Sequence, residues 1–96
     1  MLTSKQRAKL KSIAVNTDTI MQIGKGGIID TLIKQVDDAL NAREIIKLHV
    51  LENSSVTAKE AGVELANATN SELVQVIGSR VVLYRRSEDN PRINLN

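Results

Sequence analysis

Apolar residues recur with two different periods along this chain of 96 residues, and the two periods alternate. Helical spacing of three to four residues occurs in residues 3–14, 28–42 and 57–69. Short apolar runs typical of strands occupy residues 20–23, 44–51, 73–77 and 80–86. The predicted order is α-β-α-β-α-β-β. This order indicates an α/β fold, a two- or three-layer sandwich with one mixed, four-stranded sheet.

The connections between these runs predict how the strands pair. Residues 44–51 are apolar on both faces, which suits a central strand beside a parallel neighbour. Together with residues 20–23 and the helix between them, this strand forms a βαβ unit that should cross over right-handed. Gly78-Ser79 separates the last two strands. A two-residue Gly-Ser loop is typical of a type II′ hairpin, so these strands should be antiparallel.

Two helix starts and two buried stripes follow from local patterns. Thr3 with Gln6, and Thr57 with Glu60, fit capping boxes. The buried stripes are predicted from helical periodicity. Their positions are Ile29, Leu32, Ile33, Val36 and Leu40 in the second helix, and Ala58, Ala61, Leu65 and Ala68 in the third.

Length and composition limit the class of protein. The chain is long enough for one domain, which we place at residues 1–86, followed by a flexible polar tail at residues 87–96. It has no Cys, which fits a reducing cytoplasm. No apolar run approaches the ~20 residues that span a membrane, and no signal-peptide core follows Leu2. We therefore expect a cytoplasmic protein without a membrane partner.

Positive charge is concentrated at the two ends of the sequence. Residues 1–29 carry a net charge of +4, residues 30–72 carry −4, and residues 73–96 carry +2, which sum to the net +2 of the chain. If the fold brings the ends together, a basic face lies opposite an acidic one. Tyr84 is the only aromatic residue, so the chain cannot build the aromatic platform on which many single-strand readers stack bases.

The most distinctive motif is a glycine turn between the first strand and the second helix, formed by Gly24, Lys25, Gly26 and Gly27. Glycine lets backbone approach a ligand closely, and the helix start offers free N–H groups to a phosphate. A P-loop requires Lys followed by Ser or Thr, and here Gly26 follows Lys25. A dinucleotide fingerprint requires a small third residue, where this chain has Ile29. The G-x-x-G loop of KH-type domains, which clamps a nucleic-acid backbone, fits; an ordinary glycine-rich turn is the alternative.

The first helix is basic and carries no acidic residue. Its like-charged pairs four residues apart repel each other by a few tenths of a kcal/mol, which suggests a polyanionic partner; a solvated basic face is the alternative. Arg85 and Arg86 at the end of the last strand are further candidates if they lie on the same side. The predicted contact residues are Lys5, Arg7, Lys9 and Lys11 with Gly24, Lys25, Gly26, Gly27, Arg85 and Arg86.

Catalysis is not indicated by the residues. His49 is the only imidazole and has no acid–base partner beside it in sequence, and a His within a strand is more often structural. Asp37-Asp38 suits a solvated helix face better than a metal site, which requires more ligands. We therefore expect no enzyme activity, no metal, no cofactor and no small-molecule substrate.

Taken in order, several blocks of the sequence resemble the CRM domain (chloroplast RNA splicing and ribosome maturation) in its stand-alone bacterial, YhbY-type form. The blocks are Leu2-Thr3-Ser4-Lys5-Gln6-Arg7, Gly24-Lys25-Gly26-Gly27-Ile28, Glu44-Ile45-Ile46-Lys47-Leu48 and Val74-Gln75-Val76-Ile77-Gly78, with Val82-Leu83-Tyr84-Arg85 after them. The resemblance covers residues 2–86. The loop often has a basic or polar residue where this chain has Gly26.

The resemblance implies a sheet similar to that of the C-terminal domain of bacterial translation initiation factor three. It also implies binding of structured RNA, association with precursors of the large ribosomal subunit, and no catalysis. We accordingly expect a monomer that binds ribosomal RNA through the G-x-x-G loop and the basic helix. The alternative is a protein-interaction module on the ribosome or another ribonucleoprotein, without direct RNA contact.

Overall fold

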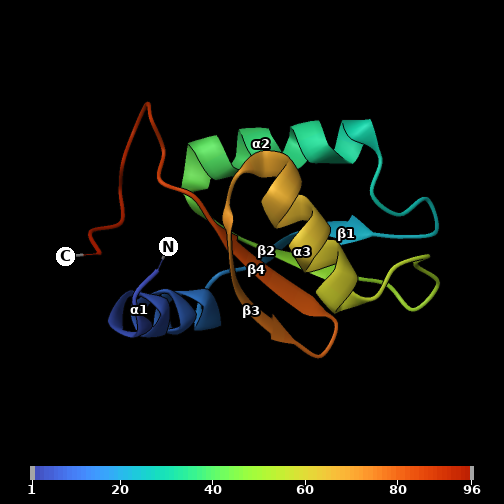
Figure 1. Ribbon diagram of the computed structural model, residues 1–96, viewed down its shortest axis with the longest axis horizontal. Coiled ribbons are helices and arrows are strands. Elements are labelled where there is room, and N and C mark those ends of the chain that lie inside the picture. Colours follow the sequence, from blue (N-terminus) through green and yellow to red (C-terminus); the bar gives the residue numbers. More distant parts are fainter. Residues whose placement is uncertain (1, 96) are drawn as a thin grey trace.

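A four-stranded mixed sheet organises the protein. The computed structural model describes residues 2–95, and its strand order is β1-β2-β4-β3 (Figure 1). β1 and β2 are parallel, whereas β2 with β4 and β4 with β3 are antiparallel, which confirms the predicted mixed sheet. The elements are α1 (Ser4–Val15), β1 (Thr19–Ile23), α2 (Asp30–Arg43), β2 (Ile45–Val50), α3 (Ala58–Thr69), β3 (Glu72–Ile77) and β4 (Arg80–Tyr84).

Helices cover both faces of the sheet, so the sandwich has three layers. Helices α2 and α3 lie on one face, over the larger core, where Ile46 and Leu48 of β2 are fully buried. Helix α1 lies on the other face, where Leu10 and Ala14 pack on Ile45 and Tyr84. None of the helices within residues 2–95 has the length and apolar character to cross a bilayer.

Local sequence signals set the helix starts, with one exception. The capping boxes of α1 and α3 are both present: Thr3 and Thr57 each accept a bond from the N–H three residues on, at 3.1 Å. The second helix begins at Asp30 rather than at residue 28, because Ile29 has extended backbone and forms the N-cap. Ile29 is therefore 52% exposed, and its predicted burial is wrong.

The third helix buries a different residue near its end from the one predicted. Ala68 is exposed, while Thr69 is buried. The Thr69 hydroxyl donates to the Leu65 carbonyl at 2.7 Å, so its polar group is satisfied inside the protein. Apolar character alone therefore misidentified the buried position.

The β3–β4 hairpin has the predicted form. Ile77 pairs with Arg80, which leaves Gly78 and Ser79 as a two-residue loop. Gly78 has φ +56° and Ser79 has a negative φ, the combination of φ signs that a type II′ turn uses. The Ser79 carbonyl accepts from the Val50 N–H at 2.8 Å, so the hairpin is joined to the end of β2.

The glycine turn after β1 is supported by the loop after β2. The Gly27 N–H donates to the Gly24 carbonyl at 3.0 Å, and Gly27 has φ +68°. A Cβ at Gly27 would lie 2.6 Å from the Ser55 hydroxyl, whereas a Cβ at Gly26 would meet nothing within 4 Å. Gly27 is thus required by its conformation and by its neighbour, whereas Gly26 has free space around it.

A buried carboxylate anchors the segment that follows β4. Glu44, between α2 and β2, is fully buried and has φ +67°. Its carboxylate accepts the N–H groups of Ser87, Arg92 and Ile93 at 2.8, 2.6 and 2.7 Å. Ile93 and Leu95 pack against the smaller core under α1.

The segment predicted as a flexible tail therefore makes specific contacts with the domain. It contains no helix or strand within the described residues, but its hydrogen bonds to Glu44 hold it against the sheet. Residues 1 and 96 of the predicted domain and tail lie outside the described residues.

The charge on Glu44 is favoured by its hydrogen bonds. Burial acts to raise the pKa of the Glu44 carboxyl, but the three backbone N–H donors and the positive charge of Arg86 outweigh it. The pKa is consequently lower than the ordinary value of 4.5. A carboxyl with a lowered folded-state pKa stabilises the fold fully above its unfolded pKa, and this contribution is lost as the pH falls through the folded value.

Replacing Glu44 should destabilise the protein and reduce its acid sensitivity. In Glu44→Gln, an amide with only one acceptor oxygen faces three backbone donors, so we expect the free energy of unfolding to fall by about 2 kcal/mol. The parent chain should lose stability as the pH drops below about 4.5, and the variant should lose less. Urea unfolding at neutral and acidic pH measures both. The exposed Glu88→Gln is the control, and equal stability of the two variants would contradict the anchoring role.

Two glycines of the turn should respond differently to a methyl group. Gly27→Ala forces a positive φ on alanine and brings Cβ against Ser55, so we expect a loss of about 1–2 kcal/mol in unfolding free energy. Gly26→Ala has neither penalty and should change stability by less than about 0.5 kcal/mol. Urea midpoints of the two variants compare them directly. A Gly26→Ala variant less stable than Gly27→Ala would refute this account of the turn.

Candidate nucleic-acid interface

The glycine turn places an exposed cation next to the uncapped start of α2. Lys25 and Gly26 are exposed at the tip of the turn. Helix α2 begins directly after it and, unlike α1 and α3, has no side-chain hydrogen bond at its N-cap. The first-turn N–H groups therefore have no side-chain acceptor at the N-cap, and residues 30 and 31 are exposed at the positive end of the helix dipole. Asp30 brings one negative charge to the same turn. The arrangement suits a phosphate oxygen that lies near Lys25 and away from the Asp30 carboxylate.

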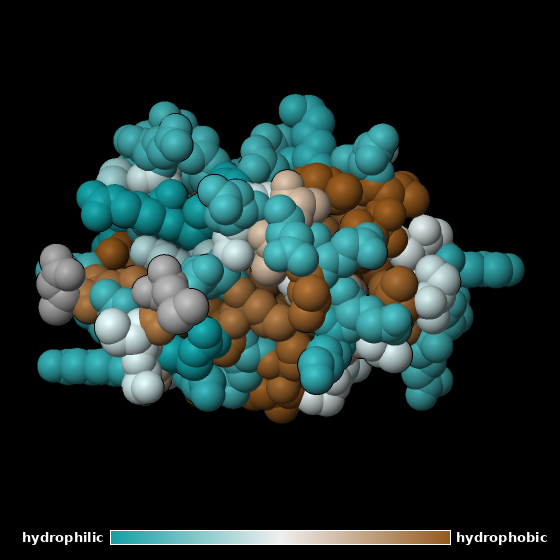
Figure 2. Space-filling model, viewed as in Figure 1, coloured by the Kyte–Doolittle hydropathy of each residue, from teal (hydrophilic) through white to brown (hydrophobic). Residues whose placement is uncertain are grey.

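A shallow hollow of about 300 Å³ lies beside the turn. Its lining includes the polar residues Gln22, Thr31 and Gln35, together with Gly24 and Gly26 of the turn. Apolar side chains are exposed nearby, since Ile29 at the N-cap of α2 is half exposed. On the face that carries α2 and α3, Figure 2 shows apolar atoms gathered over the half of the molecule that holds this turn.

The basic helix does not adjoin the glycine turn. Helix α1 and the turn at residues 24–27 lie at opposite ends of the longest axis of the molecule (Figure 1), which is 38 Å long. The last strand ends on the α1 side, so Arg85 and Arg86 are also distant from the turn. The positive residues predicted for one surface therefore form two groups. The basic surface of α1 is therefore not directly continuous with the glycine turn.

Three of the predicted cations have structural partners. The Arg7 guanidinium donates to the carbonyls of Leu73 and Val74 at 2.7 and 2.8 Å. These carbonyls lie at an irregularity of β3, where the ladder is interrupted. Arg7 therefore fastens α1 to the sheet, and the Lys9 ammonium similarly donates to the backbone carbonyl of Asn94.

Arg85 likewise has structural partners, and its side chain joins β4, α3 and α2. Its guanidinium pairs with the Asp37 carboxylate at 2.6 Å and donates to the Thr69 carbonyl at 2.7 Å. It thus connects the ends of β4 and α3 to the middle of α2. Lys5, Lys11, Lys25 and Arg86 are the predicted cations for which no such bond holds the charged group within residues 2–95.

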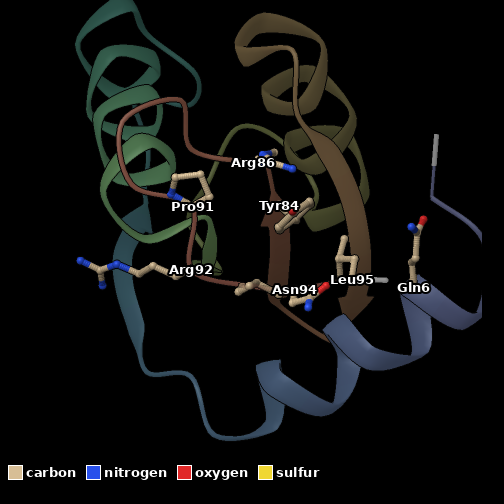
Figure 3. A pocket seen from close by; sticks show the side chains of 8 residues that line it. Gln6, Tyr84, Arg86, Pro91, Arg92, Asn94 and Leu95 are labelled. Atoms are coloured by element: carbon tan, nitrogen blue, oxygen red, sulfur yellow. The ribbon is translucent and has the colours of Figure 1, made fainter.

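Arg86 lies at a second hollow, between the C-terminal segment and α1. This hollow has a volume of about 440 Å³, and Figure 3 shows Tyr84 within it and Arg92 pointing away from Gln6. Burial raises the pKa of the Tyr84 hydroxyl; the negative charge of Glu44 adds to this shift and the positive charge of Arg86 opposes it. Tyr84 is 7% exposed, so the one aromatic ring offers little surface for base stacking.

Two residues that contribute to the turn region were not predicted. Ser55 supports Gly27 from the loop after β2, and Gln22 lines the hollow from β1. Neither has a local sequence signal, because their positions depend on the parallel pairing of β1 with β2. Within residues 2–95, no group of three or more His, Asp or Glu side chains is arranged to hold a metal ion.

The whole fold matches a solved structure. The solution structure of the hypothetical protein SAV1595 from Staphylococcus aureus, described as a candidate RNA-binding protein, superposes with a TM-score of 0.82. That protein is 55% identical to this chain, and the match covers 100% of both chains. The α/β architecture is therefore shared by a protein of known structure.

Sequence relatives carry RNA-binding names. YqeI of Bacillus subtilis, named a probable RNA-binding protein, is 44% identical over 95 residues and is matched over 99% of both chains. An RNA-binding protein of Haemophilus influenzae is 31% identical over 88 residues, which are 92% of this chain and 89% of that one. Residues 2–85 match the model of the CRS1/YhbY (CRM) domain. The chain therefore belongs to the CRS1/YhbY (CRM) domain family.

Proposed function

We propose that this protein binds ribosomal RNA through the glycine turn and assists assembly of the large ribosomal subunit in the cytoplasm. The observation that carries the proposal is the exposed turn at residues 24–27, with Lys25 at its tip and an α2 N-terminus that no side chain caps. Backbone N–H groups and one cation together suit the phosphates of a polymer. Family membership and the RNA-binding names of the relatives support RNA as that polymer.

Recognition in this proposal depends on phosphate and RNA shape. The single aromatic ring is buried, so bases have no stacking platform among residues 2–95. Lys5 and Lys11 on α1, together with Arg86, form a second positive area at the far end of the molecule. An RNA that reaches both areas would have to extend along the 38 Å axis, which favours a folded RNA over a short single strand. The protein acts as a monomer and performs no catalysis.

A second candidate function is a protein-interaction module on a ribonucleoprotein. Exposed apolar side chains on the face that carries α2 and α3 favour it, since Ile29 is 52% and Val63 45% exposed. Residues 30–72 are also net acidic. This role requires no contact between RNA and the glycine turn, so the two functions differ in how they respond to changes there.

Introducing negative charge at the tip of the turn should weaken RNA binding strongly without unfolding the protein. Lys25→Asp combined with Gly26→Asp removes one positive and adds two negative charges at positions where the fold has room. Gly27 is left unchanged because its φ is positive. Loss of one charge-assisted phosphate contact is worth about 1.5–3 kcal/mol, so we expect affinity for large-subunit ribosomal RNA to fall at least about tenfold. Fluorescence anisotropy measures this affinity.

The matched control makes the same change of charge on α3. Lys59→Asp combined with Asn67→Asp alters two exposed positions far in sequence from the turn. Circular dichroism and urea unfolding should show both double variants folded. Equal RNA affinity of the turn variant and the control variant would refute the turn as the RNA contact.

The protein should also associate with large-subunit particles in a salt-dependent manner. Phosphate contacts release counterions, so binding weakens as salt is raised. We expect co-sedimentation with precursor particles at low salt and its loss at high salt. Absence of the protein from these particles at every salt concentration would contradict the role in subunit assembly, whatever its affinity for free RNA.

A further inference from the structure

Half of one sheet face has no helix over it. On the face opposite α2 and α3, α1 shares a core cluster with Ile45 at the start of β2 and with Val82 and Tyr84 in the middle and at the end of β4. The other half of this face, toward the hairpin and the end of β2, lies beyond α1 (Figure 1). We call this part the bare sheet half and define it by two rows of residues that the strand register places side by side. Val82 in the second row is buried and marks the border with the core under α1.

The register identifies the side chains of the bare sheet half. Residues paired across strands point to the same face, and Val82, which belongs to the core cluster under α1, fixes which face that is. One row is Gln22, His49, Arg80 and Ile77, and the other is Thr19, Lys47, Val82 and Gln75. None of these eight residues is acidic.

Basic side chains are concentrated in the middle of this surface. Lys47 and His49 are two residues apart on β2, about 7 Å along the strand, and Arg80 is directly opposite His49, about 5 Å away. Arg80 is exposed, and Lys47 and His49 are half-buried. Within residues 2–95, neither Lys47 nor His49 has a side-chain hydrogen bond or ion pair, and Arg80 contacts only the Ser79 hydroxyl at 3.2 Å.

This surface lies between the two positive areas that the fold separates. Gln22 comes two residues before Gly24 and lines the hollow beside the glycine turn. Lys47 is next to Val82, on which α1 packs. The bare sheet half therefore continues from the turn at one end of the molecule to α1 at the other, and the intervening cations are free, in contrast to Arg7 and Arg85.

We propose that the bare sheet half is a further contact surface for the RNA backbone, which joins the glycine turn to α1. The inference rests on the proposed RNA-binding function. The two rows hold Arg and Lys groups and no carboxylate, a composition that complements phosphate, and Arg80 can bind two phosphate oxygens at once. No aromatic residue lies in the two rows, so the surface holds the backbone rather than stacked bases.

Neutralising Lys47 and Arg80, the Lys and Arg side chains of the two rows, tests the surface. We expect Lys47→Gln combined with Arg80→Gln to lower affinity for large-subunit ribosomal RNA about five- to twentyfold. If both residues bind phosphate, the slope of log affinity against log salt should become shallower by about 1.4–1.8, which is about 0.7–0.9 for each phosphate that is no longer neutralised. Neither side chain stabilises the fold through an ion pair, so the urea midpoint should be unchanged.

The matched control is Lys34→Gln combined with Lys59→Gln, which removes the same charge from exposed positions on α2 and α3. It should leave affinity and salt slope near those of the parent. If the sheet variant keeps the parent affinity and slope while the turn variant loses binding, the surface is refuted and the proposed function stands. If the parent chain does not bind the RNA, both the proposed function and the proposed sheet surface are refuted.

A protein partner for the same surface gives a different result. In that case the sheet variant would bind free ribosomal RNA normally but would no longer co-sediment with large-subunit particles, which would overturn the RNA assignment. Amide chemical shifts in ¹⁵N-labelled protein provide a second measurement. Titration with RNA should shift the signals of Lys47, His49 and Arg80 as well as those of the turn, and unshifted strand signals would count against the inference.

Discussion

The central strand β2 is the constraint on which the rest of the structure depends. It pairs with β1 on one side in parallel and with β4 on the other in antiparallel register. Its Ile46, Leu48 and Val50 are buried beneath α2 and α3, so that face requires two helices. On the opposite face only Ile45 is buried at its start, while Lys47 and His49 remain partly exposed. One strand therefore sets both the three-layer arrangement and the limit of what α1 covers.

Parallel pairing of β1 and β2 also brings the loops that form the glycine turn region together. The carboxyl ends of parallel strands meet at one edge of a sheet, so residues 24–27 and the loop containing Ser55 become neighbours. The Leu51 N–H donates to the Ile23 carbonyl at 2.9 Å and extends this pairing to the strand ends. The phosphate-binding geometry we propose is thus a consequence of strand order. A glycine turn without the second loop would have less to fix its conformation.

Charge has two separate roles in this protein. Arg7, Arg85 and the Glu44 carboxylate are used inside the structure, where they bind backbone groups that strand irregularities and chain ends leave unpaired. Lys25, Lys47 and Arg80 make no comparable contact and are available to a partner. The sequence shows only that all of these residues are charged. Hydrogen-bond partners distinguish the structural charges from the available ones, and partners depend on tertiary contacts.

The sequence by itself determined the elements whose signals are local. Capping boxes at Thr3 and Thr57, the Gly78-Ser79 hairpin and the apolar character of β2 act within a few residues, so they predicted helix starts, an antiparallel pair and a central strand. Tertiary structure alone decided the positions that depend on pairing across the sheet. It separated α1 from the glycine turn, placed Ser55 against Gly27, fixed the C-terminal segment on Glu44 and left the bare sheet half uncovered. These outcomes result from strand register and helix packing between residues far apart in the chain, and periodicity carries no information about such contacts.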